Sequence, residues 1–67
     1  MKTLQEQITS AKRELALRNR VYPSLIQRGK LRPDQAQHEI ECMEAIIQTL
    51  ELQETVEDVR QGQLGLR

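Results

Sequence analysis

Hydrophobic residues recur at alternating steps of four and three along the first part of the chain. Apolar or large residues fall in these steps at Leu4, Ile8, Ala11, Leu15, Arg18, Tyr22 and Leu25. Such steps place side chains on one face of an α-helix, because one turn holds 3.6 residues. The pattern predicts a helix over about residues 4–28.

Local signals mark the ends of this helix and one interruption. Thr3, followed three residues later by Glu6, matches a capping box. Pro23 removes a backbone hydrogen bond, so the helix either kinks there or ends and restarts at Ser24. We favour the kink, because the apolar stripe continues past the proline. Gly29 suits the left-handed residue that follows a helix.

A second stripe with the same spacing follows a short connection at residues 29–32. Pro33 suits the first turn of a helix, and the stripe comprises Ala36, Ile40, Met43, Ile47 and Leu50. The same register then reaches the two acidic residues Glu54 and Glu57. We therefore expect the stripe to shift onto Leu52, Val56 and Val59, either at a packing stutter or where this helix outruns its partner.

Two helices with a short connection predict an all-α antiparallel hairpin. One domain would span residues 1–61, with the second helix over about 33–61 and a flexible tail at 62–67. Equal rise along both helices would place Ile8 opposite Leu52. The predicted core and interface residues are Leu15, Tyr22, Leu25, Ile40, Met43, Ile46, Ile47 and Leu50.

The small size of the chain favours self-association. A core built from 67 residues rarely supplies more than about 3–5 kcal/mol of net stability. Cys42 is the single cysteine, so no internal disulfide can form, and a lone thiol fits a reducing compartment. The hydrophobic residues also exceed what one hairpin can bury. We expect a homodimer in which two hairpins form a four-helix arrangement.

Charge is sorted along the chain, although the net charge is zero. Residues 11–32 carry seven cations and one anion, and residues 33–59 carry eight anions and no Lys or Arg. Antiparallel packing brings the two halves together. Arg18 interrupts the apolar stripe and is predicted to form a structural ion pair with Glu44, or with Glu41. Charges pointing away from the seam remain for a partner, namely Arg13, Arg20, Glu51, Glu54 and Asp58.

Candidate chemistry is sparse. His38 and Cys42 share a helical face and could present two metal ligands, but the chain has no other His or Cys. A surface histidine beside a half-buried cysteine is the simpler interpretation. No nucleophile–base arrangement or glycine-rich phosphate loop is present, so we expect no enzymatic activity and no cofactor. Without a long apolar run or a signal peptide, we expect a cytoplasmic protein and no membrane contact.

One further pattern covers about residues 15–50. It reads R-x-x-V-Y-P, a helix ending in G-[RK]-[ML], then A-x-x-E-I-x-x-M-x-x-I. The residues that carry it are Arg18–Ile26, Gly29–Leu31, Ala36, Glu39–Ile40 and Met43–Ile47. In this pattern the chain resembles a family of small phage and prophage proteins. The resemblance implies a temperate-phage accessory protein in the bacterial host, with no catalytic residues.

These observations predict a non-enzymatic protein–protein interaction module acting on a host or phage protein. One alternative is nucleic-acid binding by the basic first helix, since cations supply most nonspecific affinity for phosphates. The acidic second helix and the single aromatic residue, Tyr22, disfavour that alternative. Another alternative is a structural subunit of a larger assembly.

Overall fold

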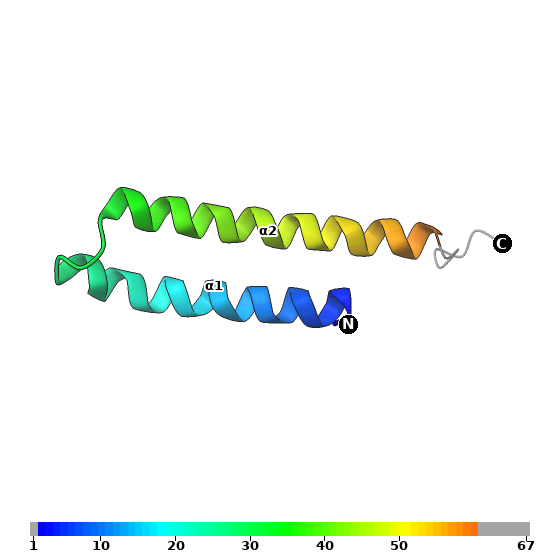
Figure 1. The fold of residues 1–67 in the computed structure, drawn as a ribbon, viewed down its shortest axis with the longest axis horizontal. Helices are drawn as coiled ribbons and strands as arrows, with labels where there is room; N and C mark the ends of the chain where they lie inside the picture. The colour runs from blue at the N-terminus through cyan, green and yellow to red at the C-terminus, as the bar shows by residue number, and fades with distance from the viewer. Residues whose placement is uncertain (1, 61–67) are drawn as a thin grey trace.

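The protein is a long, narrow hairpin of two antiparallel helices. The computed structural model describes residues 2–60, which form α1 (Leu4–Gln27) and α2 (Pro33–Arg60) (Figure 1). The molecule measures 57 × 20 × 18 Å and has a radius of gyration of 16.2 Å, whereas a compact domain of this length has about 11 Å. The predicted all-α antiparallel hairpin is confirmed over residues 2–60, and the flexible tail predicted at 62–67 lies outside the described residues.

A capping box begins α1, as the sequence predicts. The backbone N–H of Glu6 donates to the Thr3 hydroxyl at 3.1 Å, and the backbone N–H of Thr3 donates to the Glu6 carboxylate at 2.9 Å. These two bonds satisfy donors that have no partner within the helix. The cap therefore fixes the first turn of α1.

Pro23 does not divide α1. The helix continues through it to Gln27, so the alternative of two separate helices is wrong. Tyr22 and Ile26, on either side of the proline, together with Ala36 and Ile40 of α2, line one shallow groove between the helices. The contacts of Tyr22 and Ile26 with α2 offset the backbone hydrogen bond that Pro23 removes.

Gly29 ends α1 in the predicted left-handed conformation, with φ at +72°. Its N–H donates to the carbonyl of Ile26 at 3.0 Å, and the N–H of Lys30 donates to the carbonyl of Leu25 at 2.8 Å. This pair of bonds is a Schellman motif, which satisfies carbonyls at the end of the helix. The chain then reverses direction, and the Arg32 carbonyl accepts the first α2 bond from Ala36 at 2.9 Å.

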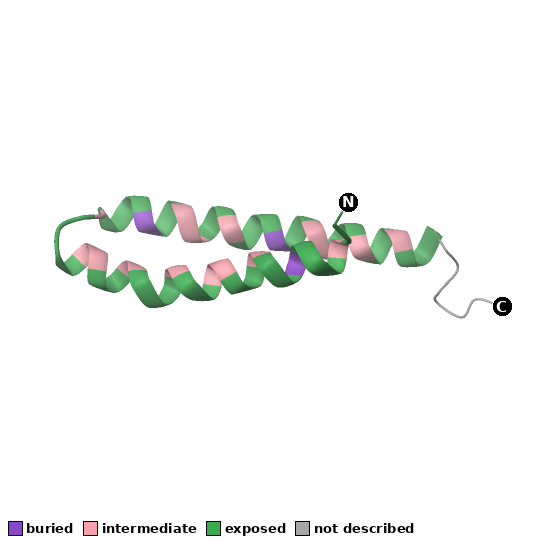
Figure 2. Ribbon diagram, turned by 60° about the horizontal axis from the view of Figure 1, so that its bottom comes forward, coloured by how far each residue is buried: buried purple, intermediate pink, exposed green. Residues whose placement is uncertain are grey.

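An inner stripe of α2 faces α1, and it comprises Ala36, Ile40, Met43, Ile47, Leu50, Glu54 and Glu57. On α1 the facing residues are Leu4, Ile8, Ala11, Leu15, Arg18, Tyr22, Leu25 and Ile26. Only Ile8, Ala36 and Ile47 are buried among the described residues, and the rest of both stripes is half-buried (Figure 2). One hairpin thus encloses very little core.

The predicted shift of the α2 stripe is wrong. Leu52, Val56 and Val59 are exposed, whereas Glu54 and Glu57 are half-buried. Leu52 is 65% exposed, so it does not pack under Ile8 as predicted. The helix keeps one register to its end, and a long acidic side chain can occupy a half-buried position while its carboxylate reaches water.

Candidate interaction surfaces

The predicted core residues mostly lie in the seam between the helices. Ile47 is buried, and Leu15, Tyr22, Leu25, Ile40, Met43 and Leu50 are half-buried. Ile46 is the exception, because 47% of it is exposed. Together with Ala45, Thr49 and Leu50 it lines a shallow apolar depression on the surface of α2. Ile46 is therefore an interface candidate and not part of the hairpin core.

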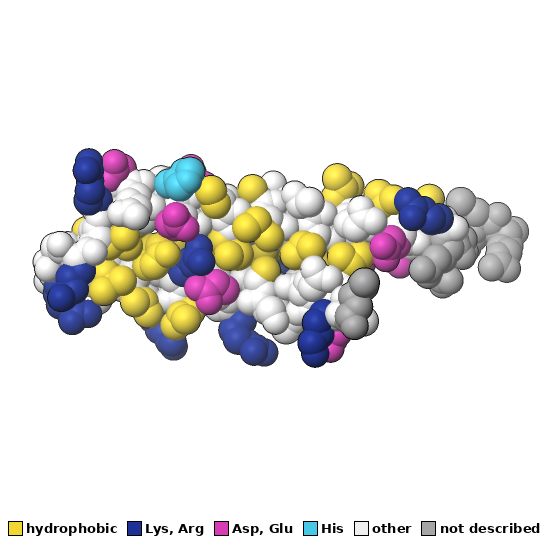
Figure 3. Space-filling view, in the orientation of Figure 1, with side chains coloured by type: hydrophobic (Ala, Val, Ile, Leu, Met, Phe, Trp, Pro, Cys, Tyr) yellow, Lys and Arg dark blue, Asp and Glu magenta, His cyan; other side chains and the backbone are white. Residues whose placement is uncertain are grey.

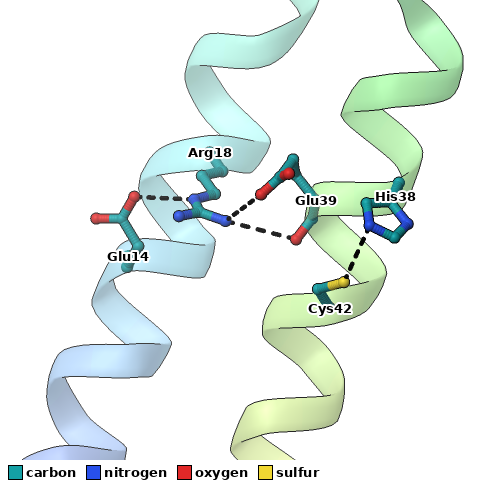
Figure 4. Close-up of polar contacts among 5 residues, drawn as sticks. All are labelled: Glu14, Arg18, His38, Glu39 and Cys42. Carbon is teal, nitrogen blue, oxygen red and sulfur yellow. Dashed lines mark hydrogen bonds and ion pairs between the residues drawn. The ribbon is translucent and has the colours of Figure 1, made fainter.

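Arg18 lies in the middle of the seam and holds two carboxylates (Figure 4). Its Nε donates to Glu14 Oε2 at 2.9 Å, and an Nη atom lies 3.5 Å from both the carbonyl and Oε1 of Glu39. The predicted pairing of Arg18 with Glu44 is wrong. Glu44 is exposed, whereas Glu14 is one turn away on α1 and Glu39 is half-buried on the facing side of α2.

This cluster is structural in character. The hydrogen bond that Arg18 donates to Glu14 raises the pKa of Arg18 above its ordinary value; burial opposes this rise, and the charges of neighbouring residues add smaller increases. The Arg18 side chain is 23% exposed, so it is only partly available to a ligand. The cluster thus joins the two helices and leaves little positive charge for a partner.

A second interhelical ion pair uses a residue that the sequence assigns to a partner. Glu51 Oε2 lies 2.9 Å from Lys12 Nζ on α1. Glu54 is half-buried in the inner stripe, and Asp58 is exposed. Of the three acids predicted to bind a partner, Asp58 alone keeps a fully exposed position, because the other two face α1.

The outward side of α1 is basic. Arg13, Arg20 and Arg28 are exposed, and Arg13 and Arg20 flank Ala16 and Leu17 in a shallow depression. Within residues 2–60, the cations that form ion pairs are Lys12, Arg18 and Arg32. Arg13 and Arg20 thus keep the outward positions predicted for them.

A run of exposed, uncharged residues follows the outward side of α2, and we call it the outer stripe: Ala45, Thr49, Leu52, Val56 and Val59. Each member lies two residues from a member of the inner stripe, about 200° around the helix. Hydrophobic side chains are visible at the outer edge of α2 near its C-terminal end (Figure 3). Leu52, Val56 and Val59 are the residues of the predicted stripe shift, and their exposure contradicts a packing stutter that would bring them against α1.

The other candidate chemistry is limited to one contact. Cys42 Sγ lies 3.5 Å from His38 Nε2, and both residues are exposed (Figure 4). Within residues 2–60, no three His, Cys, Asp or Glu side chains gather in a group that could hold a metal ion. The described helices also contain no segment long and apolar enough to cross a membrane.

Comparisons with known proteins add no relative. No family model, curated protein or solved structure matches the chain.

Proposed function

We propose that the protein is a non-enzymatic protein–protein interaction module that acts as a homodimer. The observation that carries the proposal is the imbalance between buried and exposed apolar residues. Three hydrophobic residues are buried in the hairpin, whereas Leu17, Val21, Ile46, Leu52, Val56 and Val59 are exposed. Exposed apolar patches on a soluble chain mark interaction sites.

Self-association supplies the core that one hairpin lacks. Small chains without disulfides or metals commonly gain stability by oligomerisation, and two-fold symmetric dimers are the commonest form. Two hairpins would then make a four-helix arrangement. The resemblance to small phage proteins supports a role in the bacterial host, where the dimer would bind a host or phage protein.

The direct experiment is affinity purification from bacterial lysate with the tagged full-length chain, with and without nuclease, at several salt concentrations. We expect to recover a protein partner equally well with and without nuclease. A bait that carries both Leu17→Asp and Val21→Asp should no longer recover it. Recovery of the same background proteins with both baits would contradict a partner at this surface.

Light scattering of the purified chain tests the homodimer separately and also detects growth into a larger assembly.

Nucleic-acid binding is the second candidate, and the exposed cations of α1 favour it. Arg13 and Arg20 lie on the outward side of this helix, and Arg28 is exposed at its C-cap, so these cations could contact phosphates. Binding of this kind weakens steeply with salt because it releases counterions. A gel shift at low salt that disappears in Arg13→Glu/Arg20→Glu would support it, and no shift at low salt would exclude it.

A further inference from the structure

We propose that the second copy docks on the outer stripe of α2, with the two α2 helices antiparallel. This inference rests on the proposed homodimer and specifies its face and its direction. The outer stripe is a heptad seam, since its five members alternate in steps of four and three from Ala45 to Val59. Seams of this spacing pack against another helix by inserting side chains between those of the partner.

The outer stripe is free of charge, although 30% of the chain is charged. Asp58 of the same segment is exposed but lies outside the stripe, and the other acidic residues are half-buried on the other side of the helix, namely Glu51, Glu54 and Glu57. A solvent-facing side with Leu52, Val56 and Val59 exposed costs hydration free energy unless it is covered. The distribution of charge therefore indicates a helix that is contacted on both sides.

The stripe is complementary to itself when reversed. In an antiparallel pair of helices, the a positions of one heptad seam face the d positions of the other. This places Ala45 opposite Val56 of the second copy and Thr49 opposite its Leu52. Cys42, three residues before the stripe, faces Val59. Each layer then combines a small side chain with a larger one, and alternating small and large residues fill an interface without voids.

Charge at the two ends of the stripe also favours the antiparallel direction. Glu41 lies near one end, Arg60 lies near the other, and both are exposed. The reversed pairing brings Glu41 of one copy level with Arg60 of the other, twice by symmetry. A parallel pair would instead place like charges together, which is destabilising.

This geometry predicts a flat dimer in which the four helices lie side by side. Because α1 covers the inner stripe and the second copy covers the outer stripe, the four helices form a row in the order α1, α2, α2 and α1. Each α2 is then covered on two sides, which supplies the buried surface missing from the hairpin.

Pairs of single-cysteine variants test the face and the direction. In a Cys42→Ser background, one batch carries Ala45→Cys and another carries Val56→Cys. We expect an equimolar mixture to form disulfide-linked dimers at least ten times faster than either batch alone. Position 45 lies about 16 Å along the seam from its own copy in the antiparallel pair, too far for a disulfide. Asp58→Cys, exposed but outside the stripe, is the matched control.

Each result has one consequence. Rapid linkage of Ala45→Cys to itself would mean a parallel pair and would overturn the inference. A dimer by light scattering that links no faster than the Asp58→Cys control would place the interface elsewhere, and the homodimer would stand without this face. A monomer at all concentrations would overturn both proposals.

A charge placed in the stripe provides a second test that leaves the hairpin folded. Leu52 is 65% exposed, so Leu52→Asp should keep the helical circular dichroism of the single chain at low concentration. We expect the dimer dissociation constant to rise at least tenfold, whereas the exposed neighbour Thr55→Asp should leave it unchanged. Equal dissociation constants for the two variants would overturn the inference.

Discussion

The two halves of α2 use opposite sides of the helix for their apolar residues. From Pro33 to Leu50, the side facing α1 carries Ala36, Ile40, Met43 and Ile47, which are buried or half-buried. From residue 51 to residue 60, the same side carries Glu51, Glu54 and Glu57, and the apolar residues Leu52, Val56 and Val59 are exposed on other sides. The first half buries its apolar residues within the hairpin, whereas the second half leaves its apolar residues exposed in the single chain.

This difference explains how one short helix can take part in a hairpin and still carry a separate exposed apolar surface. A helix that was apolar on both sides along its whole length would expose more hydrophobic surface in the monomer and would favour aggregation. Separating the two apolar segments along α2 confines most of the exposed surface to one end. The comparison predicts that substitutions on the inner side matter most in the first half.

The largest effect should come from Ile47→Asp, because Ile47 is only 6% exposed. Burying an unpaired carboxylate costs several kcal/mol, which is comparable to the total of about 3–5 kcal/mol available to so small a core. We expect loss of the helical circular dichroism signal at 25 °C. Ile46→Asp is the matched control, because its neighbouring position is 47% exposed, and it should stay folded. Equal melting temperatures for the two variants would contradict the assignment of the inner stripe.

The next effect should come from Arg18→Glu, which replaces the cation between Glu14 and Glu39 with a third carboxylate. We expect about 2 kcal/mol less unfolding free energy, within the range for breaking a partly buried network. Arg13→Glu, on the outward side of α1, should change stability by about 0.5 kcal/mol or less. Urea unfolding at matched protein concentration measures both. A loss as large in Arg13→Glu as in Arg18→Glu would show that general charge balance, and not this contact, stabilises the helix pair.

A stabilising substitution sharpens the comparison further. Glu54 occupies an inner-stripe position in the second half of α2 and is half-buried. Glu54→Leu should raise the unfolding free energy by about 1 kcal/mol, because part of an apolar side chain leaves water. The same substitution at the exposed residue Asp58 should not stabilise the hairpin. Lower stability in Glu54→Leu would mean that the carboxylate is needed in the seam.

Much of the hairpin can be predicted from the sequence, because its strongest determinants are local. Steps of three and four residues define the stripes, Thr3 and Glu6 define the cap, and Gly29 defines the turn. Each of these depends on neighbours within a few positions. The seam residues from Leu15 to Leu50 follow directly, once the two helices are known to be antiparallel.

The errors concern long side chains and the choice between two stripes. Arg18 can reach several carboxylates, and spacing alone does not decide between Glu14, Glu39 and Glu44. After Leu50, the inner stripe can continue in the same register on Glu54 and Glu57, or shift by two residues onto apolar side chains. Burial of apolar groups favours the shifted stripe. Rotating the helix to bury that stripe would, however, disrupt the packing of the first half of α2 against α1. The rigid helix transmits the register of its first half to its end.

The smallest effect should come from the ion pair between Lys12 and Glu51, which joins α1 to the second half of α2. Its nitrogen and oxygen are 2.9 Å apart, and the two side chains are 58% and 46% exposed. Exposed pairs contribute about 0–1 kcal/mol and are screened by salt. A double-mutant cycle with Lys12→Ala and Glu51→Ala should give a coupling free energy of about 0.5 kcal/mol at low salt and close to zero at high salt. The corresponding cycle with Arg18→Ala and Glu39→Ala should retain more of its coupling, because that pair is less exposed. If salt abolished both couplings equally, then the two halves of the hairpin would not differ in how firmly their helices are joined.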